Sequence, residues 1–182
     1  MFDVSAAGSK VRVECGKNSC NITEFYDEGT PFETNEVEVT GSGVTLNGQL
    51  VLWRKPVAYV VTITVIPGSQ DDVWLAKRLD DAHIRPGHVI DVDRLKAKLT
   101  IWVPQINASG RQKSTIATSY TNGRILSGPT GPSTNAEGKL SGKTYSFVFE
   151  DQSVAETSAG VDVGYSVITA KKGARHDSRR LF

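Results

Sequence analysis

Two cysteines and three histidines are the residues of this 182-residue chain that most often bind metals or act as nucleophiles. Cys15 and Cys20 flank a turn-forming tetrapeptide between two strand-like runs, so they could face each other across a hairpin. A disulfide, half of a metal site and two reduced thiols all fit that position. Zinc needs two further ligands, and His83, His88 and His176 show no paired ligand spacing. The spacing therefore favours ordinary, partly buried thiols over a metal site.

Asp91 and Asp93 form an Asp-Val-Asp pair, which could bind a metal ion or supply an acid and a base. On a strand, a period of two would place both carboxylates on one face, although this pattern is commoner at a solvated strand edge. The sequence has no phosphate-binding loop, no His-Glu-x-x-His and no Gly-x-Ser-x-Gly. We therefore predict that the protein is not an enzyme and needs no cofactor.

The composition predicts one globular domain over residues 1–182, with 38% hydrophobic and 23% charged residues. A formal net charge of +1 gives no general attraction to nucleic acid. No apolar run approaches the ~20 residues that a membrane helix needs, and the N-terminus does not have the pattern of a secretory signal. We expect cytosol-like surroundings and no membrane partner.

The strongest local pattern is a strand over residues 57–65 that leads into a helix near residues 70–83. In the strand, apolar side chains alternate with side chains that become polar toward its end. Ser69 and Asp72 have the spacing of a capping box, and Leu75 and Leu79 belong to an apolar stripe. One helix packed against a sheet is therefore expected.

Further strands are predicted from alternating patterns, and their short connections favour an antiparallel sheet. These strands cover residues 10–15, 21–26, 36–40, 95–103, 143–150 and 161–168, together with a hairpin over 44–53 around Asn47-Gly48. Residues 105–142 are rich in Ser, Thr, Gly, Asn and Pro, and we expect a loop-rich insertion there. Residues 169–182 form a basic C-terminal tail.

The loop over residues 27–35 is too long for a tight hairpin and carries Phe32 next to Pro31. An apolar anchor in a polar loop is typical of an interface, because a few such anchors usually dominate binding. We predict that this loop contacts a neighbouring subunit. The candidate interface residues are Tyr26, Pro31, Phe32, Leu181 and Phe182.

The order of these elements resembles that of tail tube proteins of contractile-tailed bacteriophages and of tube-like baseplate ring proteins with the same fold. The resemblance covers residues 5 to 150 approximately. It rests on the two early strands, on the single helix and on four short motifs, Glu28-Gly29-Thr30-Pro31-Phe32, Asn47-Gly48, Ile66-Pro67-Gly68-Ser69 and Gly142-Lys143-Thr144-Tyr145-Ser146-Phe147. It implies a mainly β fold, in which two antiparallel sheets form a sandwich or small barrel with one flanking α-helix.

The resemblance also implies a structural virion protein that is assembled in the host cytoplasm. Six copies would form a homo-hexameric ring of the tail tube or of the tube-baseplate junction, and stacked rings would contact tail sheath or baseplate proteins. Genomic DNA would meet the protein only in transit. We expect an acidic or neutral channel wall that carries Glu36, Glu38, Thr62 and Thr64, because such a wall does not retain DNA. The alternative is a capsid decoration protein or another β-sandwich binding module.

Overall fold

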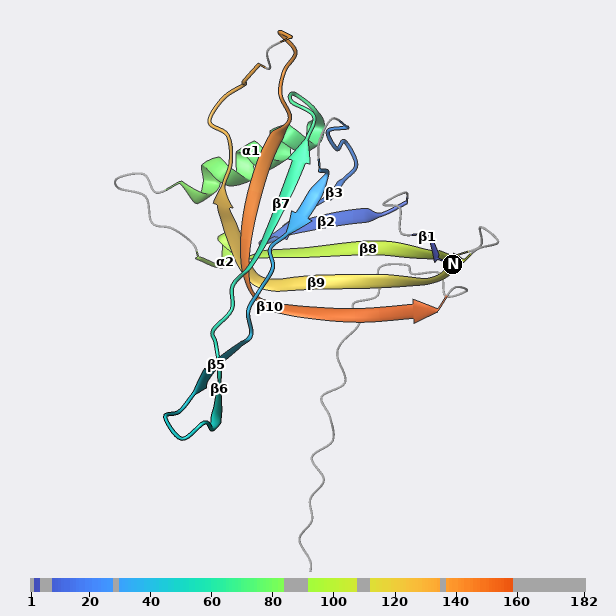
Figure 1. The fold of residues 1–182 in the computed structure, drawn as a ribbon. Helices are drawn as coiled ribbons and strands as arrows, with labels where there is room; N and C mark the ends of the chain where they lie inside the picture. Colours follow the sequence, from blue (N-terminus) through green and yellow to red (C-terminus); the bar gives the residue numbers. More distant parts are fainter. Residues whose placement is uncertain are drawn as a thin grey trace, which may run out of the picture.

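Ten strands and two helices make up the part of the chain that the computed structural model describes, which is residues 2–3, 8–27, 30–83, 92–107, 112–134 and 137–158 (Figure 1). In chain order they are β1 (Phe2–Asp3), β2 (Lys10–Cys15), β3 (Asn18–Ile22), β4 (Phe32–Thr34), β5 (Thr40–Val44), β6 (Leu50–Arg54), β7 (Tyr59–Val65), α1 (Gln70–Ala82), α2 (Val92–Leu95), β8 (Ala97–Asn107), β9 (Gln112–Ser127) and β10 (Lys143–Ser158).

Eight of the strands form one antiparallel sheet in the order β3-β2-β8-β9-β10-β7-β4, with β1 paired to β8. The other two, β5 and β6, form a separate antiparallel pair. The predicted fold class, mainly β with two antiparallel sheets and one flanking helix, is confirmed. The second helix, α2, is a single turn of four residues.

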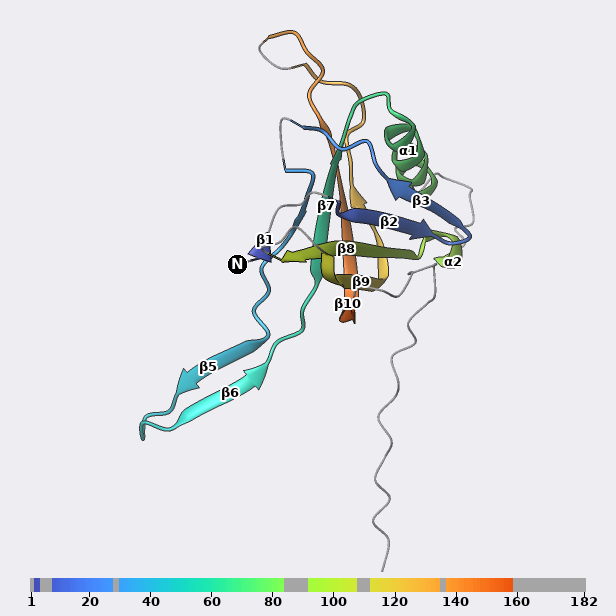
Figure 2. The ribbon, with the colours of Figure 1, turned by 90° about the vertical axis from the view of Figure 1, so that its right-hand side faces the viewer.

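The large sheet bends sharply where β9 and β10 pass from one half of the molecule to the other (Figures 1 and 2). Asn122 has a positive φ of 55°, and the pairing of β8 with β9 shifts register between Ala97 and Leu99. At Gly123 an added Cβ would lie 2.1 Å from the ring of Phe149, so a larger residue does not fit the bend. One sheet thereby folds over itself and encloses a core, as a sandwich does.

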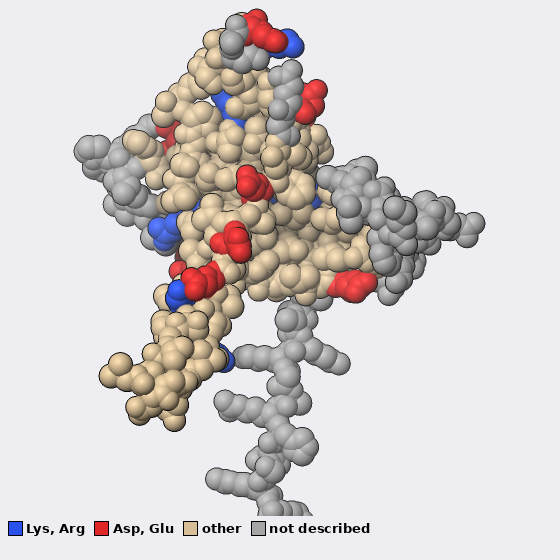
Figure 3. Space-filling model, in the orientation of Figure 1, with Lys and Arg blue, Asp and Glu red and all other residues tan. Residues whose placement is uncertain are grey.

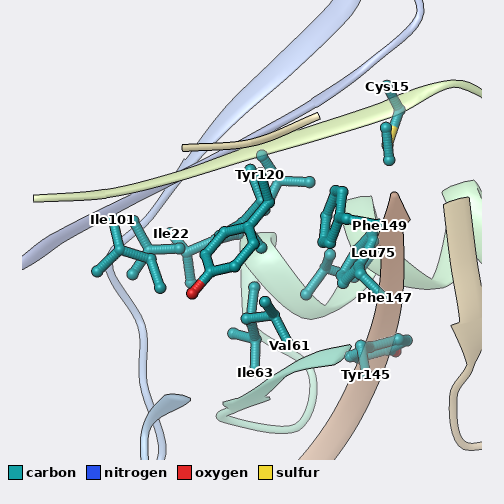
Figure 4. Packing of buried hydrophobic residues seen from close by; sticks show 14 of the residues in the cluster. Cys15, Ile22, Val61, Ile63, Leu75, Ile101, Tyr120, Tyr145, Phe147 and Phe149 are labelled. Carbon is teal, nitrogen blue, oxygen red and sulfur yellow. The ribbon is translucent and has the colours of Figure 1, made fainter. Parts of the chain in front are cut away.

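The core lies between these two halves and collects one face from each strand (Figure 4). The alternating patterns predicted for β2, β7 and β10 are confirmed, because every second residue is buried over 11–15, 61–65 and 145–149. These buried residues include Val11, Val13, Val61, Ile63, Val65, Tyr145, Phe147 and Phe149. Each such side chain stabilises the fold by about 1.5–3 kcal/mol relative to an exposed position.

Helix α1 flanks the sheet and begins as the sequence predicts. Ser69 is the N-cap, and its Oγ accepts a hydrogen bond from the Asp72 backbone N–H at 3.1 Å. The reciprocal bond goes one residue further back than in a capping box, because the Asp72 carboxylate accepts from the N–H of Gly68 at 2.7 Å. Leu75 is completely buried, and Leu79 packs against the core.

Two strand predictions near the N-terminus need correction. The strand expected over residues 36–40 is wrong, because residues 35–39 have no strand pairing and β5 begins only at Thr40. Val39 is 55% exposed. The strand expected over 21–26 runs instead over Asn18–Ile22, since Gly16 adopts a positive φ of 57° and tightens the preceding turn.

The loop-rich expectation for residues 105–142 is wrong for its first part. Strand β8 runs on to Asn107, and β9 covers sixteen residues from Gln112 to Ser127. The Ser and Thr residues that suggested a loop occupy strand positions, where β-branched Thr fits well. Strand β8 begins at Ala97 rather than at 95, because α2 ends at Leu95. The predicted strand over 161–168 and the basic tail over 169–182 lie outside the described residues.

Candidate assembly interface

The β5–β6 hairpin projects away from the large sheet, and both views show it standing apart (Figures 1 and 2). Its turn is the one predicted from Asn47-Gly48. Gly48 has a φ of 76°, and its N–H donates to the carbonyl of Thr45 at 2.9 Å, as in a three-residue hairpin loop. The hairpin prediction is confirmed.

The hairpin exposes an unusual number of large apolar side chains. Six of them have exposed fractions from 46% to 107%: Val44, Leu46, Leu50, Val51, Leu52 and Trp53. Residues 39–53 contain no charged residue, and in Figure 3 the outer part of the hairpin is tan, with charged atoms only toward its base. Contiguous exposed apolar surface of this kind marks an interaction site. The hairpin is therefore the first candidate interface.

Both faces of the hairpin carry apolar groups. On one face, the Trp53 ring lies over Gly41, where an added Cβ would be 2.3 Å from the indole. Leu50 and Leu52 lie on the other face, because they alternate with Val51 and Trp53 along β6. A continuous apolar run is typical of a strand covered on both faces. In the described residues β6 pairs only with β5, and its apolar side chains are exposed.

A second candidate interface is the outer edge of the second half of β10. Strand β10 pairs with β7 from Lys143 to Phe149, whereas its residues 151–158 pair with β9 alone. Within the residues that the structure describes, no strand pairs with the other edge of this segment. An unpaired edge presents free N–H and C=O groups that can receive a strand from another chain. Sequence reasoning missed this edge, because the predicted strand ended at residue 150.

The edge of β7 beyond β4, unlike that of β10, has a hydrogen-bond partner for its backbone groups. The side-chain amide of Asn35 donates to the carbonyl of Ala58 at 3.2 Å and accepts from the N–H of Val60 at 2.7 Å. This side chain thus replaces a strand partner and closes the edge of the sheet. This contrast favours the second half of β10 over this part of β7 as the place where a neighbour's strand would add.

The four residues predicted to line a channel are not brought together on one strand face. Thr62 and Thr64 lie on the face of β7 opposite the core, and the Thr64 hydroxyl lies 2.9 Å from that of Thr144. Glu36 and Glu38 belong instead to the segment that leads into the hairpin, and Glu38 forms an ion pair with Lys55 at 2.7 Å. A channel-lining role for the four residues stays a prediction.

Three of the predicted interface residues are tied to β7. Phe32 starts β4, packs partly buried against the core and contacts Phe25 with ring centroids 6.3 Å apart. The Pro31 carbonyl accepts from the N–H of Thr64 at 3.0 Å, and the Tyr26 N–H donates to the Thr64 carbonyl at 3.1 Å. Contact of these residues with a neighbour stays a prediction. Leu181 and Phe182 lie outside the described residues.

The N-terminus of α1 is joined to β10 by a buried carboxylate whose role the sequence did not reveal. The Asp72 carboxylate accepts from the Tyr145 hydroxyl at 2.6 Å and from the Lys143 ammonium at 2.9 Å. Burial alone would raise the pKa of Asp72, but hydrogen bonds from Tyr145, Gly68 and Lys143 outweigh it and hold the pKa below its ordinary value. Burial and the Asp72 carboxylate raise the pKa of Tyr145. The group is therefore a structural link that stays ionised at neutral pH.

Asp71 makes a second link, to the chain that follows β3. Its carboxylate accepts from the N–H groups of Thr23 at 2.7 Å and Glu24 at 2.9 Å. In return, the Glu24 carboxylate accepts from the N–H of Gln70 at 2.9 Å, in the first turn of α1. The sequence predicted only the capping role of Asp72. The burial of Asp71 and Asp72 was not predictable, because it depends on strands distant in the sequence.

Cys15 and Cys20 do not form a disulfide or a reactive pair. Cys15 and Cys20 are free thiols, and the hairpin register places Cys15 opposite Asn18 and Cys20 opposite Val13. Burial raises the pKa of each thiol to about 11, with Asp71 adding to the effect at Cys20. Both are therefore protonated at neutral pH and poor nucleophiles.

The carboxylates of the Asp-Val-Asp pair would share one face only on a strand, and Asp93 lies in a helix instead. It lies exposed in α2, 2.9 Å from the Lys96 ammonium. Asp91, His88 and His176 lie outside the described residues, and His83 is the C-cap of α1. Among the described residues, no three metal-binding side chains cluster. No helix in the same residues is long and apolar enough to cross a membrane.

Comparison with solved structures finds distant similarity to parts of contractile injection systems. The sheath-tube complex of an extracellular contractile injection system (PVC, extended state) aligns with a TM-score of 0.49 and 15% identity, over 86% of this chain and 93% of that one. The tube-terminating cap of the anti-feeding prophage gives 0.48 and 15%, over 86% and 93%. The baseplate of the same particle gives 0.46 and 10%, over 81% and 91%.

Sequence comparison gives a more direct assignment. No curated protein matches the chain significantly. The family model for tail fiber protein gp32 matches residues 2–153, which include every described strand except the last residues of β10. The chain therefore belongs to the tail fiber protein gp32 family.

Proposed function

We propose that this protein is a structural component of a phage tail whose copies join edge to edge into a closed ring. Membership of a tail protein family supports the structural role. The observation that carries the proposal of a ring is the unpaired edge of β10 over residues 151–158. Addition of a neighbour's strand would satisfy its backbone groups.

A ring follows from the kind of contact that this edge can make. The edge of β10 could pair with the same edge of a second copy, which would give a two-fold dimer, or with a different surface of a neighbour, which is the contact proposed here. Contacts between different surfaces of identical copies generate rings when the rotation closes. The resemblance to tail tube proteins supports six copies, a stack of rings in the tail tube or at the tube-baseplate junction, and contacts with sheath or baseplate proteins.

In this proposal the channel allows DNA to pass, and the protein has no catalytic role. The acidic or neutral wall carries Glu36, Glu38, Thr62 and Thr64, and particles assemble in the host cytoplasm. Repulsion between carboxylates and phosphates keeps DNA from adhering to such a wall. The basic residues of 169–182 point away from the channel, toward acidic groups of sheath or baseplate proteins.

The direct test is electron microscopy of the purified protein, together with native mass spectrometry. We expect particles of six copies with a central channel. A monomer, or a trimer without a channel, would contradict the ring and favour a decoration or binding module. A map of the ring would also show whether Glu36 and Glu38 face the channel.

The role of the β10 edge has its own test in two neighbouring variants, Ser153→Pro and Val154→Pro. Adjacent residues of a strand direct their N–H groups to opposite sides, so one proline removes an N–H bonded to β9 and the other removes an N–H at the open edge. The variant that loses the N–H bonded to β9 should have a lower melting temperature. The variant that loses the N–H at the open edge should keep its melting temperature and remain monomeric. Rings formed normally by both variants would rule out this edge.

A further inference from the structure

We propose that Asn47, at the tip of the β5–β6 hairpin, is a site of spontaneous deamidation, which gives this uncharged hairpin a negative charge. The proposal concerns the folded protein and does not depend on the proposed ring. The dipeptide Asn-Gly occurs twice in the chain, at Asn47-Gly48 and at Asn122-Gly123. The structure leaves the first site open and constrains the second. The two sites therefore provide a comparison within one molecule.

Deamidation of an Asn-Gly sequence needs only water and a backbone nitrogen that can reach the side chain. Asparagine is a thermolabile residue. The Gly48 nitrogen loses its proton and forms a bond to Cγ of Asn47, and the Cγ–Nδ2 bond breaks with release of ammonia. Water then opens the resulting five-membered succinimide at one of its two carbonyl carbons. The product at position 47 is aspartate or isoaspartate, so a neutral amide is replaced by a carboxylate.

The surroundings of Asn47 leave the reacting groups open to water. Asn47 and Gly48 are both exposed, and a Cβ added at Gly48 would meet nothing beyond its chain neighbours within 4 Å. The N–H of Gly48 donates to the carbonyl of Thr45 at 2.9 Å, and the N–H of Gln49 donates to the Thr45 hydroxyl at 3.1 Å. Neither bond holds the Asn47 side chain. Its Cγ can therefore turn toward the Gly48 nitrogen.

The hydrogen bond from Gly48 to Thr45 must open before the reaction, and the position of the hairpin makes this opening local. Strands β5 and β6 pair only with each other in the described part of the chain, and the hairpin stands apart from the large sheet (Figure 2). Exposed turns with few contacts open at a small fraction of the free energy of global unfolding. The attack by Gly48 is therefore compatible with a folded protein.

Asn122 belongs to the same dipeptide but is held in place by its neighbours. Its side-chain amide donates to the Asp151 carboxylate at 2.6 Å, which fixes the group that would have to leave. Gly123 is buried, and it pairs with Ala97 of β8 on one side and with Phe149 of β10 on the other. Reaction here requires the strands to separate. Asn122 should therefore stay intact while the protein is folded.

The modification changes both the charge and the backbone of the hairpin. Residues 39–53 contain no charged residue, so a carboxylate at position 47 is the first charge of this stretch. Isoaspartate also lengthens the main chain by one carbon atom and so alters the turn. Burial of an unpaired carboxylate against apolar groups is unfavourable. Wherever the hairpin serves as an interface, deamidated subunits should therefore dock less well than fresh ones.

The test compares the two asparagines in one sample of the full-length protein. The protein is incubated at mildly alkaline pH, which favours loss of the proton from the Gly48 nitrogen, and is then digested with pepsin at acidic pH and analysed by mass spectrometry. In buffer we expect Asn47 to react at least about tenfold faster than Asn122, because only Asn122 requires strands to separate. In urea the two rates should become similar, because the dipeptide is the same.

Two variants at position 47 identify the reacting residue. Asn47→Gln keeps an exposed amide beside Gly48, but its longer side chain would have to close a larger ring, which forms less readily. Asn47→Asp carries the charge of the product from the start. On isoelectric focusing, wild type should change with time into a form that migrates with Asn47→Asp. Asn47→Gln should not produce this form, and both variants should have the melting temperature of the wild type, since the position is exposed.

Two outcomes would overturn the proposal. The first is a rate at Asn47 that is no higher than the rate at Asn122 in the folded protein. The second is an Asn47 that stays intact in buffer but reacts in urea, because the folded turn would then protect it. Absence of a closed ring would change neither measurement, so failure of the proposed function is distinguishable from failure of this inference.

Discussion

Asp72 is the residue through which the helix, the turn before it and strand β10 are held together. Its carboxylate accepts from Tyr145, Lys143 and the N–H of Gly68, and it is almost fully buried. Asp72→Ala removes the acceptor and leaves the Lys143 ammonium without its partner. We expect the free energy of unfolding to fall by about 3 kcal/mol, measured by urea denaturation followed by circular dichroism.

The control for this change is Asp93→Asn, which alters an exposed ion pair and should change stability by less than about 0.5 kcal/mol. Tyr145→Phe removes only the hydroxyl that donates to Asp72 and should cost about 1–2 kcal/mol. Equal stability of Asp72→Ala and the wild type would show that the buried carboxylate is not a structural link.

Because the pKa of Asp72 is lowered in the folded protein, the free energy of unfolding depends on pH in the acidic range. The unfolded-state pKa is close to 3.8, and the folded-state pKa lies below it. The stabilisation is therefore complete above the unfolded value and is lost as the pH falls through the folded value. We expect the urea midpoint of the wild type to drop below about pH 4 more steeply than that of Asp72→Asn. Parallel curves for the two proteins would assign the acid sensitivity to other carboxylates.

The two thiols should resist alkylation in the folded protein. Their pKa values of about 11 keep them protonated at pH 7.5, and Cys15 is also buried. Iodoacetamide labelling followed by mass spectrometry should show both residues labelled far more slowly in buffer than in urea. Fast labelling of Cys20 in buffer would mean that its contact with the Asp71 carboxylate does not persist in solution.

At the scale of elements, patterns within a short stretch of sequence were sufficient for part of the fold. Strand β7, the cap of α1 at Ser69 and the turn at Asn47-Gly48 depend on neighbouring residues, and all three were predicted. The alternation over 36–40 also favoured a strand, but no partner strand lies beside it. Strand β9 was obscured by its Ser and Thr residues. Its length is set by pairing with β8 and β10.

The candidate interfaces were less predictable than the strands and the helix, because they depend on contacts between distant parts of the chain. The run from Leu50 to Trp53 predicted a strand, but the sequence alone cannot show that no other part of the chain covers it. The open edge of β10 depends on where β7 stops pairing, which is a property of the whole sheet. Local patterns therefore predicted the elements but not the surfaces that they leave exposed.

Phe32 provides a prediction at this scale, because β4 fixes it against β7. Its partly buried ring contacts Phe25 and the core, so Phe32→Ala should lower the free energy of unfolding by about 1–2 kcal/mol as well as weaken assembly. Glu33→Ala, at the next and exposed position of β4, is the control. An unchanged melting temperature with weakened assembly would instead make Phe32 a pure interface residue, as the sequence suggested.

For the whole molecule, folding and assembly should be separable. The hairpin pairs only with itself in the described residues, so replacing 42–52 by a short Gly-Ser linker should change the free energy of unfolding by less than about 0.5 kcal/mol. Rings joined through β10 should persist, whereas assembly contacts made by the hairpin should disappear. Differential scanning calorimetry and electron microscopy measure the two effects. A large loss of stability would show that the hairpin also supports the folded body.

The pairing of β7 with β10 affects how the chain can fold during its synthesis. Tyr59 pairs with Phe149, so the edge of β7 that faces β10 has no partner strand until most of the chain has left the ribosome. The β2–β3 and β5–β6 hairpins join residues close in sequence and can form much earlier. The body of the subunit must then close late, and slowly for its size. Only completed chains can therefore present the β10 edge, and nascent chains cannot enter a particle prematurely.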